Sequence, residues 1–201
     1  MFGFFSENKR QDLEKIISEH AKSTVETTSH EDTIADNAEF DSSIIGQANA
    51  AYEAKDYDTA VSLYLKMEEP DGMLHAASVL FYQKKYDESF EYMKKAAEAG
   101  VWESFGGLAK AYREGWGTNV DYKKSSYWTI KAAEAGDSIC MTLAGASYLN
   151  GIFGFEKDTD LALKWLASAI FNGEPNAEDI LRGAGFKVEF DENNQMSFHR
   201  I

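Results

Sequence analysis

The pentapeptide AAEAG occupies residues 96–100 and returns at residues 132–136, a shift of 36 positions. A Tyr-x-x-Gly motif at residues 112–115 returns at residues 148–151 with the same shift. Two separate motifs that share one period indicate a repeat protein, in which each unit is a supersecondary element that stacks on the next. The sequence therefore predicts a linear array of units rather than one globular core.

Each unit has the hydrophobic pattern of two helices. A first helix is expected over residues 102–114, because Phe105, Leu108 and Tyr112 fall on one helical face. Glycines follow and end this helix, since glycine reaches positive φ at low cost. An aspartate then precedes the second helix and can accept hydrogen bonds from its free amides. A glycine, this aspartate and a core tryptophan recur at a shift of 37, as Gly117, Asp121 and Trp128 and then Gly154, Asp158 and Trp165.

Two shorter units precede this pair of units. Residues 49–60 have the pattern of a helix end, a tight turn and a helix start. Residues 80–90 repeat this order, with Tyr86 lying 29 positions after the matching Tyr57. The turn-forming residues expected at the junction are Pro70 and Gly72. The array is therefore expected to divide into four helix-pair repeats, over residues 44–70, 71–100, 101–136 and 137–173.

The motif over residues 115–136, GWGTNVDYKKSSYWTIKAAEAG, resembles the Sel-one-like repeat of bacterial type, a short relative of the tetratricopeptide repeat. Residues 49–60 are more similar to a tetratricopeptide repeat itself. The resemblance covers about residues 44–173 and is specific for 101–173. It implies an all-α fold, a right-handed α-solenoid of helix pairs. It also implies a protein-interaction scaffold, usually without catalysis.

The N-terminal part carries a different pattern. Residues 1–22 are expected to hold one short helix, because Leu13, Ile16 and Ile17 share a face. Residues 23–43 contain six acidic residues and neither Lys nor Arg. So polar a segment buries too little apolar surface to offset the entropy of ordering it. A flexible acidic linker is therefore expected there.

The C-terminal part, residues 174–201, changes from helical to strand periodicity. A short helix is expected first, and residues 186–190 and 196–201 then alternate apolar and polar side chains around a polar turn. This pattern predicts a β-hairpin. Two roles stay open for it. It caps the exposed apolar end of the solenoid, or it offers a strand to a partner's sheet.

Composition excludes several classes of protein. The 201 residues carry 20 Lys and Arg against 34 Asp and Glu, a net charge of −14 that disfavours nucleic acid as a partner. One Cys excludes a disulfide framework and a multi-Cys metal site within the chain. No apolar run approaches the roughly 18 residues of a membrane span, and the N-terminus lacks the pattern of a signal peptide. A cytoplasmic location is therefore expected.

The charge is not spread evenly, and this weakens one interpretation of it. Residues 44–173 hold 18 acidic and 13 basic side chains, a net charge of −5 over the whole predicted array. Residues 23–43 alone hold −6. The acidity is therefore poor support for an acidic binding groove in the repeats.

Residues that could carry chemistry are few. The four histidines have no ligand-like spacing, and His75 is expected to be structural. Cys140 lies beside Ile139 and Met141 on an expected helix and is expected to pack as a small hydrophobic residue. The glycines at 115–117 lack the spacing of a phosphate-binding P-loop. We expect no catalytic residue, no metal site and no cofactor.

A partner-binding surface is expected on the first helices, which line the concave face of such solenoids. The candidate residues on it are Asn49, Tyr52, Glu53, Ser78, Phe81, Tyr82, Lys110, Arg113, Glu114 and Asn150. Trp116 is a further candidate, since it lies between two glycines in a loop. It either forms a binding ridge with the apolar residues of the following loop, Ile152 and Phe153, or packs locally on the next helix.

Three functions compete at this point. The first is a non-catalytic adaptor or scaffold that binds a protein or peptide partner. The second is a cytoplasmic immunity protein or inhibitor, whose negative charge attracts a basic, nuclease-type toxin. The third, an enzyme or a nucleotide-regulated switch, is the least favoured. A monomer is expected, with a dimer through the C-terminal hairpin as the alternative.

Overall fold

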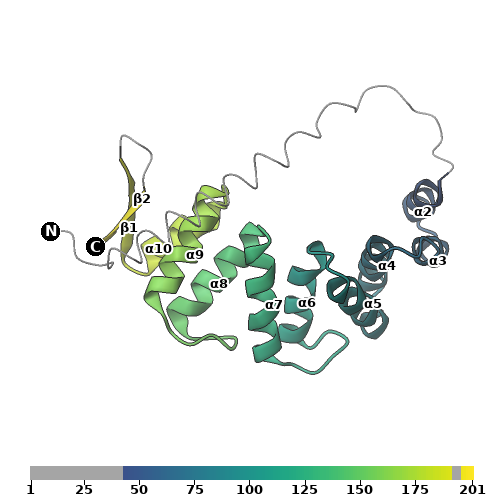
Figure 1. Ribbon diagram of the computed structural model, residues 1–201, viewed down its shortest axis with the longest axis horizontal. Helices are drawn as coiled ribbons and strands as arrows, with labels where there is room; N and C mark the ends of the chain where they lie inside the picture. Colours follow the sequence, from purple (N-terminus) through teal and green to yellow (C-terminus); the bar gives the residue numbers. More distant parts are fainter. Residues whose placement is uncertain (1–42, 192–195) are drawn as a thin grey trace. The chain divides into compact units, whose positions relative to one another are not determined.

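The computed structural model describes residues 43–191 and 196–201. The expected N-terminal helix, the expected linker up to its last residue and the hairpin turn at 192–195 lie outside this range. The elements follow one another along the chain (Figure 1). They are α2 (Ile44–Glu53), α3 (Tyr57–Leu65), α4 (Pro70–Tyr82), α5 (Tyr86–Glu98), α6 (Glu103–Glu114), α7 (Tyr122–Glu134), α8 (Ser138–Asn150), α9 (Thr159–Phe171), α10 (Pro175–Gly183), β1 (Phe186–Phe190) and β2 (Met196–Arg200).

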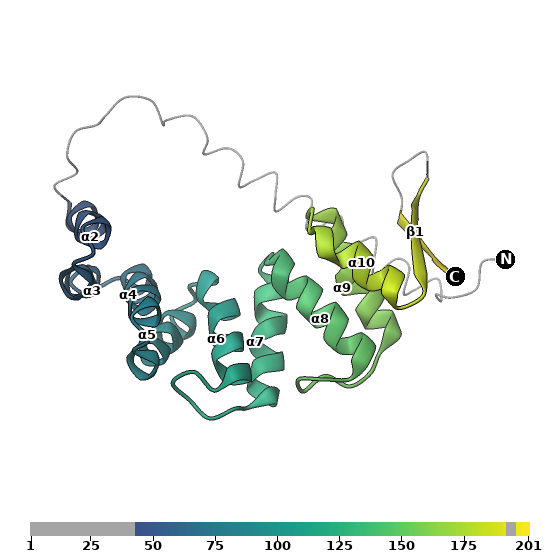
Figure 2. The same cartoon turned by 180° about the vertical axis from the view of Figure 1, so that it is seen from behind.

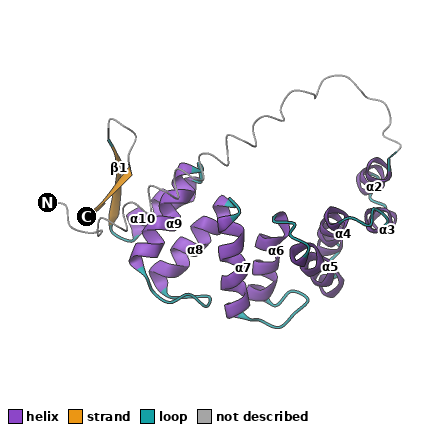
Figure 3. Cartoon of the chain, viewed as in Figure 1, coloured by secondary structure: helices purple, strands orange, loops and turns teal. Residues whose placement is uncertain are grey.

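The helices pack as consecutive pairs. Within the described residues, the main contacts join α2 to α3, α4 to α5, α6 to α7 and α8 to α9, and the second helix of each pair packs on the first helix of the next. The view from behind shows the same succession (Figure 2). The chain thus forms a right-handed α-solenoid of helix pairs with a short C-terminal β-hairpin (Figure 3), and the predicted fold class is confirmed.

Aspartates start several of the helices, as the sequence pattern predicted. The Asp121 carboxylate accepts a hydrogen bond from the Lys124 amide at 3.0 Å, and Asp158 accepts from Leu161 at 2.9 Å. Each of these bonds satisfies a backbone donor that has no partner inside the helix. Asp137 begins α8 in the same way, with a bond of 2.9 Å from the Cys140 amide.

One backbone hydrogen bond recurs at every turn between paired helices and defines equivalent positions. The residue before each second helix donates its amide to a carbonyl near the end of the first helix. The four bonds run from Asp56 to Ala51, from Lys85 to Leu80, from Asp121 to Tyr112 and from Asp158 to Tyr148, at 2.9 to 3.0 Å. Because this bond fixes how each pair turns back on itself, positions counted from its acceptor can be compared between units.

Small residues let the helices approach closely. Gly107 lies inside α6, where an added Cβ would stand 2.6 Å from the Met93 sulfur of α5. Gly145 lies inside α8, where an added Cβ would stand 2.5 Å from Leu166 of α9. Both helices run through these glycines without a break, because the neighbouring helix fills the space that a side chain would need.

The junction expected near residue 70 differs from the prediction. Pro70 is the first residue of α4, where its missing N–H costs nothing. Gly72 lies inside the same helix and is buried, because an added Cβ would overlap the Tyr64 carbonyl oxygen of α3. The expectation that Gly72 belongs to a loop was therefore wrong. Its small size is required by helix packing rather than by a turn.

The C-terminal hairpin packs on the last units of the array. Phe186, Val188 and Phe198 point to the side on which the buried side chains of Leu166 and Leu181 lie. The opposite face of the hairpin is exposed and polar and carries an ion pair of 2.7 Å between Lys187 and Glu189. An isolated two-stranded hairpin is marginal in water. The hairpin therefore covers apolar surface of the last units, and the capping role stays a prediction.

Candidate functional site

The predicted binding residues on the first helices occupy three equivalent positions of the repeat. Counted from the acceptor of the recurring turn bond, the first position holds Asn49, Ser78 and Lys110, the second holds Tyr52, Phe81 and Arg113, and the third holds Glu53, Tyr82, Glu114 and Asn150. Most of these side chains are exposed, whereas Phe81 and Arg113 are half-buried. We call this set the first-helix face.

Among the described residues, three aromatic pairs of one kind join consecutive units, and we call them the ring junctions. In each, a tyrosine that begins a second helix contacts an aromatic ring from the following unit. The pairs and their centroid distances are Tyr57 with Tyr82 at 5.4 Å, Tyr86 with Trp116 at 6.0 Å, and Tyr122 with Phe153 at 5.7 Å. Because aromatic pairs add stability beyond their buried area, these junctions help hold the stack together.

Several predicted site residues meet at these junctions. The Phe81 and Trp116 rings lie 4.9 Å apart, and the Lys110 ammonium stands 4.9 Å above the Trp116 ring. The Arg113 guanidinium lies 5.5 Å from the centroid of the Phe153 ring. Tyr82 contacts Tyr57 by its edge yet keeps 63% of its surface exposed. Much of the predicted aromatic surface therefore takes part in stacking between units.

The side chains of other predicted residues form hydrogen bonds within their own unit. The Asn49 side chain accepts a hydrogen bond of 2.6 Å from the Tyr64 hydroxyl. Ser78 and Asn150 each donate to a carbonyl one turn earlier in their helix, at 3.0 and 2.8 Å. Asn49 and Asn150 lie on the first and the last of the four helix pairs, so the structure does not bring the whole predicted set together.

The loop residue Trp116 packs against the preceding unit, a contact that neither sequence-based expectation named. Its half-buried ring contacts the rings of Phe81 and Tyr86, which belong to the preceding unit and also contact each other. These ring contacts are with the preceding unit, and a role of Trp116 in partner binding stays a prediction. The contacts of Tyr86 with Trp116 and of Tyr122 with Phe153 were not predicted, although Tyr86 and Tyr122 are 36 residues apart, which is the repeat period itself.

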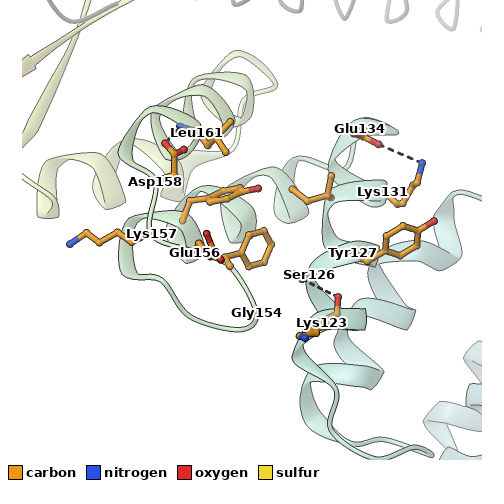
Figure 4. A pocket seen from close by; sticks show the side chains of 13 residues that line it. Lys123, Ser126, Tyr127, Lys131, Glu134, Gly154, Glu156, Lys157, Asp158 and Leu161 are labelled. Carbon is orange, nitrogen blue, oxygen red and sulfur yellow. Dashed lines mark hydrogen bonds and ion pairs between the residues drawn. The ribbon is translucent and has the colours of Figure 1, made fainter.

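A cleft that the sequence did not predict lies between α7 and the segment that leads from α8 into α9 (Figure 4). It has a volume of about 710 Å³ and is bounded by one face of α7, the loop after α8 and the start of α9. We call it the α7–α9 cleft. Its lining residues are Lys123, Ser126, Tyr127, Ile130, Lys131, Glu134, Tyr148, Gly154, Phe155, Glu156, Lys157, Asp158 and Leu161.

The α7–α9 cleft combines apolar surface with balanced charge. Tyr148 and Phe155 meet edge to face with centroids 4.8 Å apart, and Tyr127 leaves 55% of its surface exposed. Three lysines and three acidic residues line the cleft, and one pair of them, Lys131 and Glu134, lies 3.8 Å apart (Figure 4). Aromatic surface with both charge signs suits a protein segment, because such interfaces are rich in tyrosine and rimmed by polar groups.

The described residues hold no group of three His, Cys, Asp or Glu side chains that could bind a metal ion. None of the helices over residues 43–191 is long and apolar enough to cross a membrane. His75 stacks on Tyr64 with ring centroids 5.0 Å apart, which fits its expected structural role.

Cys140 is expected to be unreactive while the protein is folded. Its side chain is 5% exposed, and burial, with the Asp137 carboxylate beside it, raises the pKa of the thiol to about 12. Because the thiolate is the reacting species, a maleimide at pH 8 should label native protein far more slowly than protein in denaturant. Mass spectrometry over time measures both rates. Equal rates would show that the thiol is open to solvent in the folded state.

Comparison with known proteins gives one family and several similar structures. The family model described as "Sel1 repeat" matches residues 76–101, 107–137 and 138–170. A search among curated protein sequences gave no match. Among solved structures, a Sel1 repeat protein from Oxalobacter formigenes is 21% identical with a TM-score of 0.59, over 71% of this chain and 63% of that one.

Two further structures have the same kind of fold. One is a protective antigen of uropathogenic Escherichia coli displaying an SLR fold, 23% identical with a TM-score of 0.57, over 69% of this chain and 34% of that one. The other is the Helicobacter pylori cysteine-rich protein B, 26% identical with a TM-score of 0.50, over 63% of this chain and 96% of that one. This chain therefore spans less than two thirds of the first two proteins, and these likenesses support the fold.

Proposed function

This chain is a Sel1-repeat protein across residues 76–170, and from that premise we propose that it is a non-catalytic scaffold that binds a partner protein. Sel1 repeats generally mediate protein–protein interaction. The observation that carries the proposal for this chain is the α7–α9 cleft, which is open, lined by aromatic residues and edged by both charge signs. In this proposal a segment of the partner lies along the exposed face of α7.

The concave, aromatic-lined surface of the cleft favours it over the first-helix face as the main contact. On the first-helix face, Phe81 and the side chains of Lys110 and Arg113 already contact rings of the ring junctions. In the cleft, Tyr127 is more than half exposed, and large, rigid aromatic side chains often dominate binding energy at interfaces. The first-helix face then serves as a secondary surface, mainly through Tyr82.

Site-directed photocrosslinking tests this assignment. A benzoylphenylalanine placed at Tyr127 should capture the partner in living cells of the native host, because that side chain lies in the cleft. The same group at Tyr82 probes the first-helix face. Phe171 is the matched control, since it is 50% exposed and does not line the α7–α9 cleft. Mass spectrometry of each adduct identifies what was captured.

Each outcome decides between the surfaces. Capture at position 127 above the level at position 171 supports the cleft. Capture at position 82 without capture at position 127 moves the site to the first-helix face and rejects the cleft. Capture no stronger than the control at both positions contradicts the scaffold function itself.

The net charge of −14 favours a second candidate, inhibition of a basic toxin in the cytoplasm. Opposite charges speed the encounter of two proteins, and this effect weakens as salt screens it. The captured partner separates the two functions. A basic toxic enzyme whose association rate falls steeply with salt supports the inhibitor, whereas a neutral partner with salt-independent association supports the scaffold. A monomer suits either role.

A further inference from the structure

The series of ring junctions is incomplete at the last helix pair. The second helices α3, α5 and α7 each begin with a tyrosine whose ring meets an aromatic residue of the following unit. The second helix α9 begins with Thr159 instead. Among the described residues, α9 is followed by the short helix α10 and then the hairpin, and not by another helix pair.

A pocket lies where this partner would be expected. It has a volume of about 390 Å³, at the lower end of the size range of small-molecule sites. We call it the end pocket. Its lining residues are Leu149, Asn150, Lys157, Thr159, Ile180, Gly183, Ala184, Phe186 and Arg200. Phe186 forms part of the wall, and its half-buried ring also packs on the core beneath α10.

The charge of the end pocket differs from that of the rest of the chain. Lys157 and Arg200 line it, and no acidic residue does. Neither cation has an ion-pair partner within residues 43–191 and 196–201. The neighbouring Asp158 carboxylate is occupied by capping α9 and lines the α7–α9 cleft instead. A positive pocket in a protein of net charge −14 therefore favours an anionic group.

We propose that the end pocket binds the C-terminal aromatic residue of a partner protein. The aromatic ring takes the position that the following unit fills at the three ring junctions, against Thr159, Ile180 and Phe186. The free carboxylate of that residue pairs with Lys157 and Arg200. A C-terminal residue suits this site because it carries its ring and its carboxylate on the same Cα, and arginine binds carboxylates through two parallel hydrogen bonds.

A short peptide tests the proposal directly. The probe is the acetylated pentapeptide Gly-Ser-Gly-Ser-Phe with a free C-terminal carboxylate, titrated into the ¹⁵N-labelled full chain. The expected result is saturable shifts of the amides of Thr159, Ile180 and Arg200. Amidation of the peptide's C-terminus should weaken binding by about tenfold, because a charge-assisted hydrogen bond is lost.

Variants of the protein give the matched controls. Arg200→Gln should weaken binding about tenfold, and Lys131→Gln, which changes a lysine of the α7–α9 cleft, should leave it unchanged. Equal affinity for the amidated peptide, or for a peptide ending in Ala, overturns the proposal. Tighter binding of a peptide with an internal Asp-Phe pair also overturns it, because the C-terminus would then not be the recognised group.

This test is separate from that of the proposed function. Arg200 lines the end pocket and not the α7–α9 cleft, whereas Tyr127 lines the cleft and not the end pocket. Failure of the peptide to bind therefore leaves crosslinking at position 127 unaffected, and the reverse also holds.

Discussion

Gly117→Ala is expected to destabilise the repeat array by about 3 kcal/mol, from backbone strain and steric overlap together. Gly117 has a φ of +68°, a conformation that disfavours any side chain with a Cβ. In addition, a Cβ at this position would overlap the Tyr86 carbonyl oxygen and stand 2.8 Å from the Cβ of Phe90. The loop after α6 could then no longer lie against the start of α5, and the Tyr86–Trp116 ring junction would open.

Gly136→Ala is the matched control for this variant. Gly136 also has a positive φ, +105°, but nothing lies within 4 Å of an added Cβ. Its substitution therefore carries the strain without the overlap and should cost about 1–2 kcal/mol. Urea unfolding followed by circular dichroism measures both values. Equal losses for the two variants would contradict the close contact between the loop and α5.

Gly154→Ala repeats the experiment one unit further along. Gly154 has a φ of +86°, and an added Cβ would overlap the Tyr122 carbonyl oxygen, as at Gly117 with Tyr86. The same geometry at two equivalent positions means that the second glycine of the loop is required for docking on the preceding unit. The sequence predicted these glycines as helix breaks. Their second role depends on a neighbouring unit and is not visible in local sequence.

The other predictions differ in the same way: features set by local sequence were predicted correctly, and features set by a neighbouring unit were not. The helix pairs followed from local signals, such as the AAEAG motif and the capping aspartates before α7 and α9. Gly72 was assigned to a loop, because a glycine after a proline has that local meaning. Its place inside α4 is set by the approach of Tyr64 from α3, which the sequence pattern does not encode.

The candidate sites show the limit of sequence reasoning most clearly. Tyr82 and Lys110 were correctly placed on the first helices, but whether a ring is free depends on what the next unit brings to it. The α7–α9 cleft joins side chains of α7 to Phe155 in a loop after α8. Such a site depends on how far one unit is displaced from the next, which the repeat period alone does not determine.

The last prediction concerns the cap. Leu181→Ala is expected to cost about 2–5 kcal/mol, the usual range for removing a fully buried leucine side chain. Leu181 is 0% exposed and belongs to the core that contains Met141, Leu166 and the hairpin residue Phe186. Because each unit of a solenoid is stabilised mainly by its neighbours, the loss should be concentrated at the C-terminal end of the array.

Hydrogen exchange of the native protein tests where the loss occurs. In Leu181→Ala, amides of α10, β1 and β2 should exchange faster by a larger factor than amides of α4 and α5, which lie several units away. Ile201→Ala is the matched control, since this residue is 73% exposed at the same end of the chain and should change little. Faster exchange by one common factor along the whole array would mean that the units unfold together. Unchanged exchange of the hairpin amides would mean that the hairpin is held by something other than α10, and the capping role would then have to be given up.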